Sequence, residues 1–261
     1  MRFDVITLFP ELFAPFLTSG INRRAFETGA VDLKLWQLRD FADGAYRRVD
    51  DRPFGGGPGM VMLAEPLEQC LSAIRQDRSL QTPEKPQVPV VLFSPIGQTL
   101  NHSAVESWSQ SDGAILICGR YEGLDQRFID AHVNVQISLG DFVLSGGEIA
   151  AIALLDAVAR LQPGVLNDEG SHQMDSFNPA LDGLLDCGHY TRPETWNEQT
   201  VPSVLMSGHH ADIAKWRRQQ SLALTQKHRP DLIESARAMG KLSAKDEHFL
   251  VQYSNSSTRN T

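Results

Sequence analysis

The stretch GDFVLSGGE, residues 140–148, leads directly into the segment IAAIALLDAVARL, residues 149–161. Glycines flank an apolar turn in the first stretch, and such glycines are typical of a backbone that passes close to a ligand or to another segment. The second stretch carries apolar side chains at helical spacing, which we expect on one face: Ile149, Ile152, Leu155 (or Ala153) and the pair Val158–Ala159. Together the two stretches predict a close-packed turn that feeds an α-helix, and they leave open what the turn contacts.

Short apolar runs of β-type composition alternate with helix-like segments before this turn. The predicted strands are Phe3–Leu8, Val31–Trp36, Val90–Phe93, Ala114–Ile117 and Val133–Ser138. The predicted helices are Glu65–Arg75, Asn101–Trp108 with Asn101 as N-cap, and Asp125–Ala131. Strands that alternate with helices predict βαβ units, a mainly parallel sheet and therefore an α/β fold.

The pattern changes after Gln162. Residues 163–178, PGVLNDEGSHQMDSFN, are polar and rich in turn formers, with no sustained period. Beyond them we expect no strands, and helical patterns occupy residues 211–227, 230–239 and 243–253. The sequence thus predicts an α/β domain over residues 1–162, a flexible linker over residues 163–176 and a small α-helical C-terminal domain over residues 177–261.

Composition narrows the class of protein. The 261 residues are 41% hydrophobic and 21% charged, which is typical of a globular chain with a sizeable core. We expect no signal peptide, and no run of about 18 apolar residues predicts a membrane span. The three cysteines lie far apart in the sequence and fit a reducing compartment. We therefore expect a soluble, cytoplasmic protein without a membrane partner.

The net charge of −8 argues against a protein that coats long nucleic-acid duplexes, because each phosphate contact recruits a lysine or arginine. Arginines nevertheless pair at positions 23–24, 47–48 and 217–218, which leaves room for local RNA contacts. For any single pair, a solvated surface is the simpler interpretation.

Three predicted strands in succession end in glycine-containing turns: SPIGQ (94–98), CGRYEG (118–123) and LGDFVLSGG (139–147). Ligands of open α/β sheets bind at the carboxyl ends of strands, although each turn taken singly needs no more than the conformational freedom of glycine. The sequence has neither a P-loop nor a dinucleotide fingerprint, and the third turn carries Asp141 with no lysine or arginine. Apolar side chains and backbone donors at these turns favour a neutral heterocycle such as adenine over a polyphosphate.

Two charged residues have structural interpretations that their spacing favours. Asp175 stands in the motif DSF, which has the composition of a helix N-cap. Arg160 stands at the end of the helix that follows the third turn, where the helix dipole favours a cation. The histidines and Cys187 near the C-terminus lack the four-ligand spacing of a zinc site, so we predict no metal-binding residues.

An ordered set of segments spans nearly the whole chain: FDVITLFPELF, VDDRPFGGGPGMVM, LFSPIGQTL, CGRYEGLDQR, SLGDFVLSGGE, DAVARLQPGVL, DSF and LLDCGHYTRPE. Through these segments the chain closely resembles the bacterial tRNA (guanine-N1)-methyltransferase family, of the SPOUT class. The resemblance implies a knotted (trefoil) SPOUT-type parallel-sheet domain followed by the helical C-terminal domain. The knot comes from the resemblance alone, since knots are generally very rare and the sequence pattern shows none.

The resemblance implies that the glycine turns hold S-adenosylmethionine. The implied cofactor-binding residues are Ser94, Pro95, Gly119, Tyr121, Glu122, Gly123, Leu139, Gly140, Asp141, Phe142, Val143 and Leu144. Phe142 stands where relatives commonly have tyrosine, so an aromatic wall remains without its hydroxyl. The resemblance also implies a dependence on Mg²⁺, with Glu122 as an acidic contributor and no located ion site.

Methyl transfer to N1 of guanine requires removal of the N1 proton. The resemblance assigns this role to Asp175 as general base, and it assigns Arg160 to the guanine carbonyl, where a guanidinium stabilises negative charge on O6. The implied substrate is a tRNA with guanine at positions 36 and 37, in which guanine 37, next to the anticodon, is methylated. An RNA-facing loop with Asp50, Gly55 and Gly59 is implied to read guanine 36. The family also implies a homodimer with its active site at the subunit interface, and an RNA-binding role for residues 177–261.

Three other functions are weighed against this one. Another SPOUT-class enzyme, acting on ribosomal RNA or another tRNA position, is expected to lack the combination of GGGPGM, Arg160 and Asp175. A non-enzymatic RNA-binding protein of the same fold would bind the cofactor without transferring its methyl group. A nucleotide-hydrolysing α/β protein is disfavoured because the phosphate-binding lysine is missing.

Overall fold

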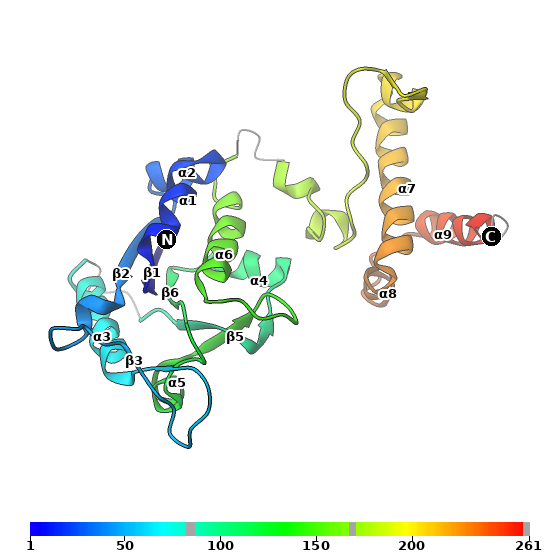
Figure 1. Cartoon of the computed structure of the whole chain (residues 1–261). Coiled ribbons are helices and arrows are strands. Elements are labelled where there is room, and N and C mark those ends of the chain that lie inside the picture. The colour runs from blue at the N-terminus through cyan, green and yellow to red at the C-terminus, as the bar shows by residue number, and fades with distance from the viewer. Residues whose placement is uncertain (82–86, 167–170, 258–261) are drawn as a thin grey trace. The chain divides into compact units, whose positions relative to one another are not determined.

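The computed structural model describes residues 1–81, 87–166 and 171–257 (Figure 1). The chain divides into two compact units, Met1–Asn167 and Asp168–Thr261. The boundary falls within the predicted linker, of which residues 167–170 lie outside the described residues. Residues 163–166 belong to the first unit, and Val165 is buried in its core. None of the helices in the described part is both long and apolar enough to cross a bilayer.

A five-stranded sheet forms the centre of the first unit, in the order β2-β1-β6-β5-β7. Its strands are β1 (Arg2–Thr7), β2 (Asp32–Gln37), β5 (Val90–Thr99), β6 (Gly113–Ile117) and β7 (Val135–Ser138). Each neighbouring pair is parallel, so the predicted parallel-sheet α/β class is confirmed. The predicted turn at residues 94–98 is instead part of β5, which pairs with β7 on both sides of a register shift between Phe93 and Gln98. Such an irregularity re-aims side chains without ending the strand.

Helices cover both faces of this sheet. They are α1 (Ala14–Thr18), α2 (Gly20–Glu27), α3 (Ala64–Gln81), α4 (His102–Ser109), α5 (Gln126–His132) and α6 (Glu148–Arg160), with short 3-10 helices at Pro10–Phe13 (η1) and Leu38–Phe41 (η2). The predicted N-cap Asn101 is confirmed, because its Oδ1 accepts a hydrogen bond from Ala104 N at 2.9 Å. Helices α1 and α2 were not predicted, because Pro15 and the pair Ser19-Gly20 interrupt their apolar pattern.

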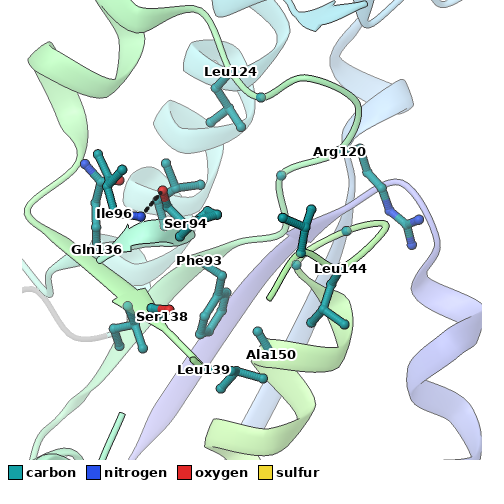
Figure 2. A pocket seen from close by; sticks show the side chains of 18 of the residues that line it. Phe93, Ser94, Ile96, Arg120, Leu124, Gln136, Ser138, Leu139, Leu144 and Ala150 are labelled. Atoms are coloured by element: carbon teal, nitrogen blue, oxygen red, sulfur yellow. Dashed lines mark hydrogen bonds between the residues drawn. The ribbon is translucent and has the colours of Figure 1, made fainter. Parts of the chain in front are cut away.

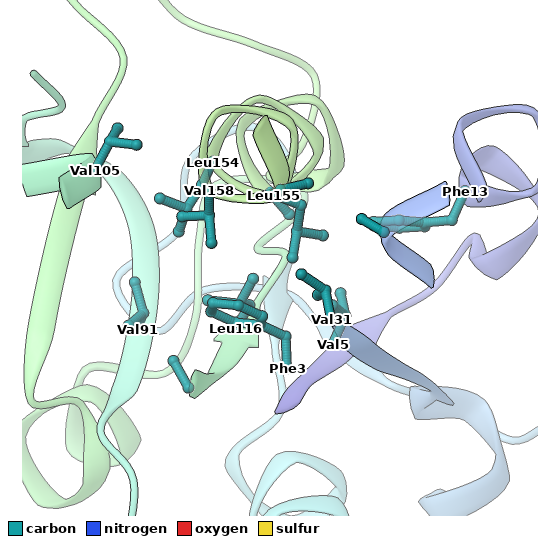
Figure 3. Packing of buried hydrophobic residues seen from close by; sticks show 14 of the residues in the cluster. Phe3, Val5, Phe13, Val31, Val91, Val105, Leu116, Leu154, Leu155 and Val158 are labelled. Atoms are coloured by element: carbon teal, nitrogen blue, oxygen red, sulfur yellow. The ribbon is translucent and has the colours of Figure 1, made fainter. Parts of the chain in front are cut away.

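Alternate residues of each strand enter two different cores, because successive side chains point to opposite faces of a sheet. On one face, Leu116 of β6 packs with Leu154 and Val158 of α6 (Figure 3). On the other face, Ile115 packs in the core that contains Leu71 of α3. The sheet is therefore the middle of three layers, and each large aliphatic side chain buried in this way contributes about 1.5–3 kcal/mol.

The face of α6 that packs on the sheet differs from the prediction at its first position. Ile149 is 55% exposed, whereas its neighbours Glu148 and Ala150 are buried. The prediction for Ile149 is wrong, although Val158 and Ala159 are buried as expected. The helix is apolar around most of its circumference, so its sequence alone does not determine which stripe faces the core.

A buried carboxylate connects β1 to α3 near the amino ends of the strands. Asp4 is fully buried and accepts hydrogen bonds from Arg2 (2.6 Å), Arg78 (2.5 Å) and Trp36 Nε1 (2.8 Å). A buried carboxylate is costly unless cations and donors surround it, and these three side chains meet that requirement.

The second unit, Asp168–Thr261, consists mainly of helices. The helices are α7 (His210–His228), α8 (Pro230–Ala238) and α9 (Ala244–Ser257), preceded by 3-10 helices at Ser171–Met174 (η3), Pro179–Leu181 (η4) and Ser203–Met206 (η5). They pack on a small core that includes Leu222, Ile233 and Leu250. The expectation of no strands is wrong, because β8 (Thr195–Trp196) and β9 (Gln199–Thr200) form an antiparallel hairpin. Strands of two residues are too short to show a period in sequence.

Asp246 connects α9 to α7 through a dense set of hydrogen bonds. Its carboxylate accepts from Ser243 N (2.9 Å) and Ser243 Oγ (2.8 Å), while Asp246 N donates to Ser243 Oγ (3.2 Å), which makes a capping box. Arg218 of α7 donates to the same carboxylate through Nε at 3.1 Å and Nη2 at 3.2 Å. Burial by itself would raise the pKa of Asp246, but the hydrogen bonds from Arg218 and Ser243 outweigh it and hold that pKa below its ordinary value.

We expect Asp246→Asn to destabilise the protein by about 1–3 kcal/mol at neutral pH, because charge-assisted hydrogen bonds are lost. The folded-state pKa is depressed, so this stabilisation is present above the unfolded pKa of about 3.9 and is lost as the pH falls through the folded pKa. Thermal unfolding from about pH 7 down to about pH 3 should therefore show the two proteins converging in acid. Glu247→Gln is the control, since its ion pair with Arg237 is exposed and should contribute less than about 1 kcal/mol. A stability difference that stays constant with pH would contradict this account.

Candidate functional site

A cleft of about 400 Å³ opens beside β5 at its register shift, where β6 and β7 lead into their turns (Figure 2). Its walls come from residues 92–96, 119–124, 136–139 and 142–147, together with Gln126, Ile129 and Ala150. The three strands are neighbours in the sheet, so residues 92–96 of β5 meet the turns that follow β6 and β7 at one edge. This is the edge at which open α/β sheets bind ligands.

Most of the residues that the resemblance assigns to the cofactor line this cleft. They are Ser94, Pro95, Gly119, Tyr121, Glu122, Gly123, Leu139, Phe142, Val143 and Leu144. Gly140 and Asp141 belong to the same loop but are not part of the lining. Gly140 shapes the turn, with a φ of +146° and its N–H donated to Ser138 Oγ at 3.1 Å, and Asp141 is exposed.

The wall of the cleft contains a polar group that the sequence does not predict. Gln136 lines it from β7, and its Oε1 is buried without a hydrogen-bond partner among the described residues. An unsatisfied buried acceptor costs about 1–3 kcal/mol, so a ligand with an amino group fits this position. The only signal in the sequence is an amide side chain between the apolar residues Val135 and Ile137.

Two glycines allow backbone segments to pass at contact distance. A Cβ on Gly97 would lie 2.5 Å from the carbonyl carbon of Gln136, and a Cβ on Gly147 would lie 2.7 Å from Cys118 Cα. In addition, Gly147 N donates a hydrogen bond to Gly119 O at 3.0 Å. The glycines before α6 therefore bring the third turn directly against the second, and the ligand-sized space lies beside that contact.

The glycine-rich segment 52–60 joins the short antiparallel strands β3 (Asp50–Asp51) and β4 (Val61–Met62). It is attached to the cleft wall, because Glu122 N donates to Met60 O at 3.0 Å and a Cβ on Gly59 would lie 2.3 Å from Glu122 Oε1. Gly59 is thus at the rim of the cleft. Gly55 is exposed with open space around it, and Asp50 is half-buried on β3; neither belongs to the lining.

Arg160 lies in the last turn of α6, in the first unit, which suits the helix dipole. Asp175 directly follows η3 in the second unit and is half-buried. The N-cap interpretation of Asp175 is wrong, because Asn178 occupies that position and accepts a hydrogen bond from Ala180 N at 2.8 Å. The main chain of Asp175 instead makes turn hydrogen bonds, from its N–H to His172 O and from Asn178 N to its own carbonyl.

Metal ligands and reactive thiols do not gather in the described part of the chain. Within residues 1–81, 87–166 and 171–257, no three or more His, Cys, Asp or Glu side chains are arranged to hold a metal ion. The expected dependence on Mg²⁺ therefore finds no site there, and Glu122 stands exposed on the cleft wall. Cys118 is fully buried, and burial raises the pKa of its thiol well above the ordinary value, so it is not a nucleophile.

Comparison with known proteins gives matches along nearly the entire chain. The family model described as tRNA (Guanine-1)-methyltransferase TrmD matches residues 1–235. A protein of Polaromonas sp. (strain JS666 / ATCC BAA-500) named tRNA (guanine-N(1)-)-methyltransferase is 72% identical over 251 residues, which cover 96% of each chain. A protein of the same name from Paracidovorax citrulli is 69% identical, and the match covers 97% of this chain and 98% of that protein. Another, from Albidiferax ferrireducens, is 71% identical, and the match covers 96% of this chain and 99% of that protein.

Proposed function

Because the chain belongs to the tRNA (guanine-N1)-methyltransferase family, we propose that it transfers a methyl group from S-adenosylmethionine to N1 of guanine 37 of tRNA, next to the anticodon. Membership of this methyltransferase family implies use of S-adenosylmethionine. The observation that carries the proposal is the cleft beside β5 and at the ends of β6 and β7, lined by residues of three successive family-like motifs.

The lining of the cleft supports the cofactor role. Its volume falls in the range of roughly 300–1,000 Å³ that is typical of small-molecule sites. Leu139, Phe142 and Leu144 provide apolar walls for an adenine ring, and Gln136 Oε1 provides an acceptor for an amino group. When bound, S-adenosylmethionine supplies an electrophilic methyl group.

Two side chains act on the guanine in this proposal. Asp175 accepts the N1 proton, which leaves an electron pair on N1 for the new bond to carbon. Arg160 donates hydrogen bonds to O6 and stabilises the negative charge that spreads onto it as the proton leaves. The N-terminal unit would then hold the cofactor, and the segment around Asp175 would supply the base.

We place the active site at the interface of a homodimer, between the α/β domain of one subunit and the linker and C-terminal domain of the other. Large apolar side chains are exposed on the first unit, on and beside η1, α2 and α6: Phe9, Leu12, Ile21 and Ile149. Exposed apolar side chains on packed neighbouring elements favour a protein partner, and a second copy is the commonest one. An isolated monomer is expected to be inactive.

The proposal also includes a knotted first domain, an RNA-facing loop, a linker and an RNA-binding domain. A trefoil knot within residues 1–162 is part of the proposal because the chain belongs to this family. Gly59, at the rim of the cleft, supports an RNA-facing loop in which Asp50 accepts hydrogen bonds from the N1 and N2 donors of guanine 36. Residues 163–176 would act as the linker, and residues 177–261 would bind RNA.

Transfer of labelled methyl from S-adenosylmethionine to two transcribed tRNAs tests this function. The tRNAs differ only in guanine or adenine at position 37, and digestion with mass spectrometry maps the product. We expect label on the guanine-containing tRNA alone, as N1-methylguanine. Label at another nucleotide would indicate a different SPOUT-class activity. Cofactor binding without any transfer would indicate an RNA-binding protein and remove the roles given to Asp175 and Arg160.

A further inference from the structure

Glu148, the first residue of α6, is a buried carboxylate that the proposed reaction does not use. Its side chain is 1% exposed. Thr7 Oγ1, at the end of β1, donates a hydrogen bond to Glu148 Oε1 at 2.8 Å, and Arg120 Nη2 lies 2.9 Å from Glu148 Oε2. One carboxylate therefore joins three segments that are far apart in the sequence: the end of β1, the turn after β6 and the start of α6.

Arg120, the cation of this pair, connects the turn after β6 to the turn after β7, which are two walls of the cleft. Its Nη1 donates to Ser145 O at 3.2 Å, and its backbone forms an antiparallel bridge with Gly146. A Cβ on Gly146 would lie 2.2 Å from Arg120 Nε, so glycine is required there for the guanidinium to pass. The ring of Phe9 covers the guanidinium at 4.5 Å from its centroid.

Arg120 belongs to the lining of the cleft, and its side chain points away from the opposite wall. Figure 2 shows the side chain of Arg120 directed away from Phe93 and Ser94, which belong to the opposite wall. The side chain of Arg120 is 17% exposed, and its Nε is buried without a hydrogen-bond partner in the described part of the chain. Such a cation depends on its carboxylate, because an uncompensated buried charge is strongly unfavourable. Without Glu148, the guanidinium would turn toward water and release Ser145.

We propose that Glu148 is a positioning residue for cofactor binding, which acts through Arg120 to hold residues 119–124 and 139–147 at the spacing that the cofactor requires. The inference rests on the proposed use of this cleft for S-adenosylmethionine. Thr7 orients the carboxylate, Glu148 orients the guanidinium, and the guanidinium fixes the carbonyl of Ser145. The cleft is thereby preorganised. The binding free energy of the cofactor is then not reduced by the entropy lost in ordering two glycine-containing turns.

Glu148→Gln tests the proposal, because it keeps the shape of the side chain and removes its charge. Calorimetric titration with S-adenosylmethionine should show a dissociation constant raised by about tenfold or more, since the two turns must be ordered on binding. The KM for the cofactor should rise with it, while the KM for tRNA should change little. Thr7→Val, which leaves the ion pair in place, should show the same effect more weakly.

Asp4→Asn is the matched control. Asp4 is likewise a fully buried carboxylate held by arginines, but it lies near the amino ends of the strands and outside the cleft lining. Its replacement should lower the unfolding temperature as Glu148→Gln does, and leave cofactor affinity unchanged. Equal losses of cofactor affinity in the two variants would overturn the proposal, since they would show a general effect of stability.

The double variant Glu148→Gln with Arg120→Gln separates stability from positioning. Removal of the unpaired cation should restore much of the loss in unfolding temperature. The hydrogen bond from Arg120 to Ser145 O is still missing in this variant, so cofactor affinity should stay low. Recovery of affinity together with stability would contradict the positioning role. A wild-type protein that does not bind S-adenosylmethionine would overturn the proposed function itself. Normal binding by both wild type and Glu148→Gln would overturn only the positioning role of Glu148.

Discussion

Asp175→Ala should lower the rate of methyl transfer by roughly 10²–10⁴-fold and leave the affinity for S-adenosylmethionine nearly unchanged. The N1 lone pair of guanine is tied into the amide system until the proton leaves, so loss of the base affects the chemical step. The cleft lies in the first unit and Asp175 in the second, so no cleft-lining residue is altered. The loss should therefore be one of rate and not of cofactor binding.

Single-turnover methylation and calorimetric titration together measure the two halves of this prediction. The turn around Asp175 should persist in the variant, because its hydrogen bonds to His172 and Asn178 are made by the main chain. Asp175→Asn, which keeps the shape and removes the basic carboxylate, should be as slow as the alanine variant. Glu247→Gln removes an exposed carboxylate of the same unit and should keep the wild-type rate. An Asp175→Ala enzyme with normal turnover would contradict the assignment of Asp175 as the general base.

Gly147→Ala should abolish tight cofactor binding and destabilise the first unit, although it adds only one methyl group. The new Cβ would lie 2.7 Å from Cys118 Cα and 3.1 Å from Gly119 N, and both are backbone atoms that no rotamer change can move. Inserting one carbon into packed structure typically costs about 1–3 kcal/mol. Separation of the two segments would also break the hydrogen bond from Gly147 N to Gly119 O.

The backbone of Gly147 has a φ of −78°, which any residue adopts, so the predicted effect is steric. Gly188→Ala is the matched control, because a Cβ there would meet nothing within 4 Å. Thermal unfolding and cofactor titration of both variants make the comparison. Gly188→Ala should behave as the wild type. A Gly147→Ala protein with normal cofactor affinity would contradict the prediction, because it would show that the third turn can move away from the second without weakening cofactor binding.

The local pattern of the sequence determined the α/β class and most element positions. Apolar runs placed the five parallel strands, and Asn101 was identified as an N-cap, because strand burial and helix capping depend on neighbouring residues. The resemblance adds the residues that we expect to bind the cofactor, since a motif preserves an arrangement that periodicity does not contain. Ser94 and Pro95 were expected in a turn, yet they lie within β5 at its register shift.

The tertiary structure alone decided the contacts between distant segments. Glu148 looks like an ordinary acidic residue in the first turn of a helix, and its burial depends on Thr7, 141 residues earlier in the chain. The role of Arg120 likewise depends on Gly146 leaving space for its guanidinium. Hydrophobic periods of two and 3.6 residues record which face of an element is buried, but not which other segment covers it. The identity of that covering segment follows from the path of the whole chain, and this path brings the register shift of β5 and two glycine-containing turns together at one cleft.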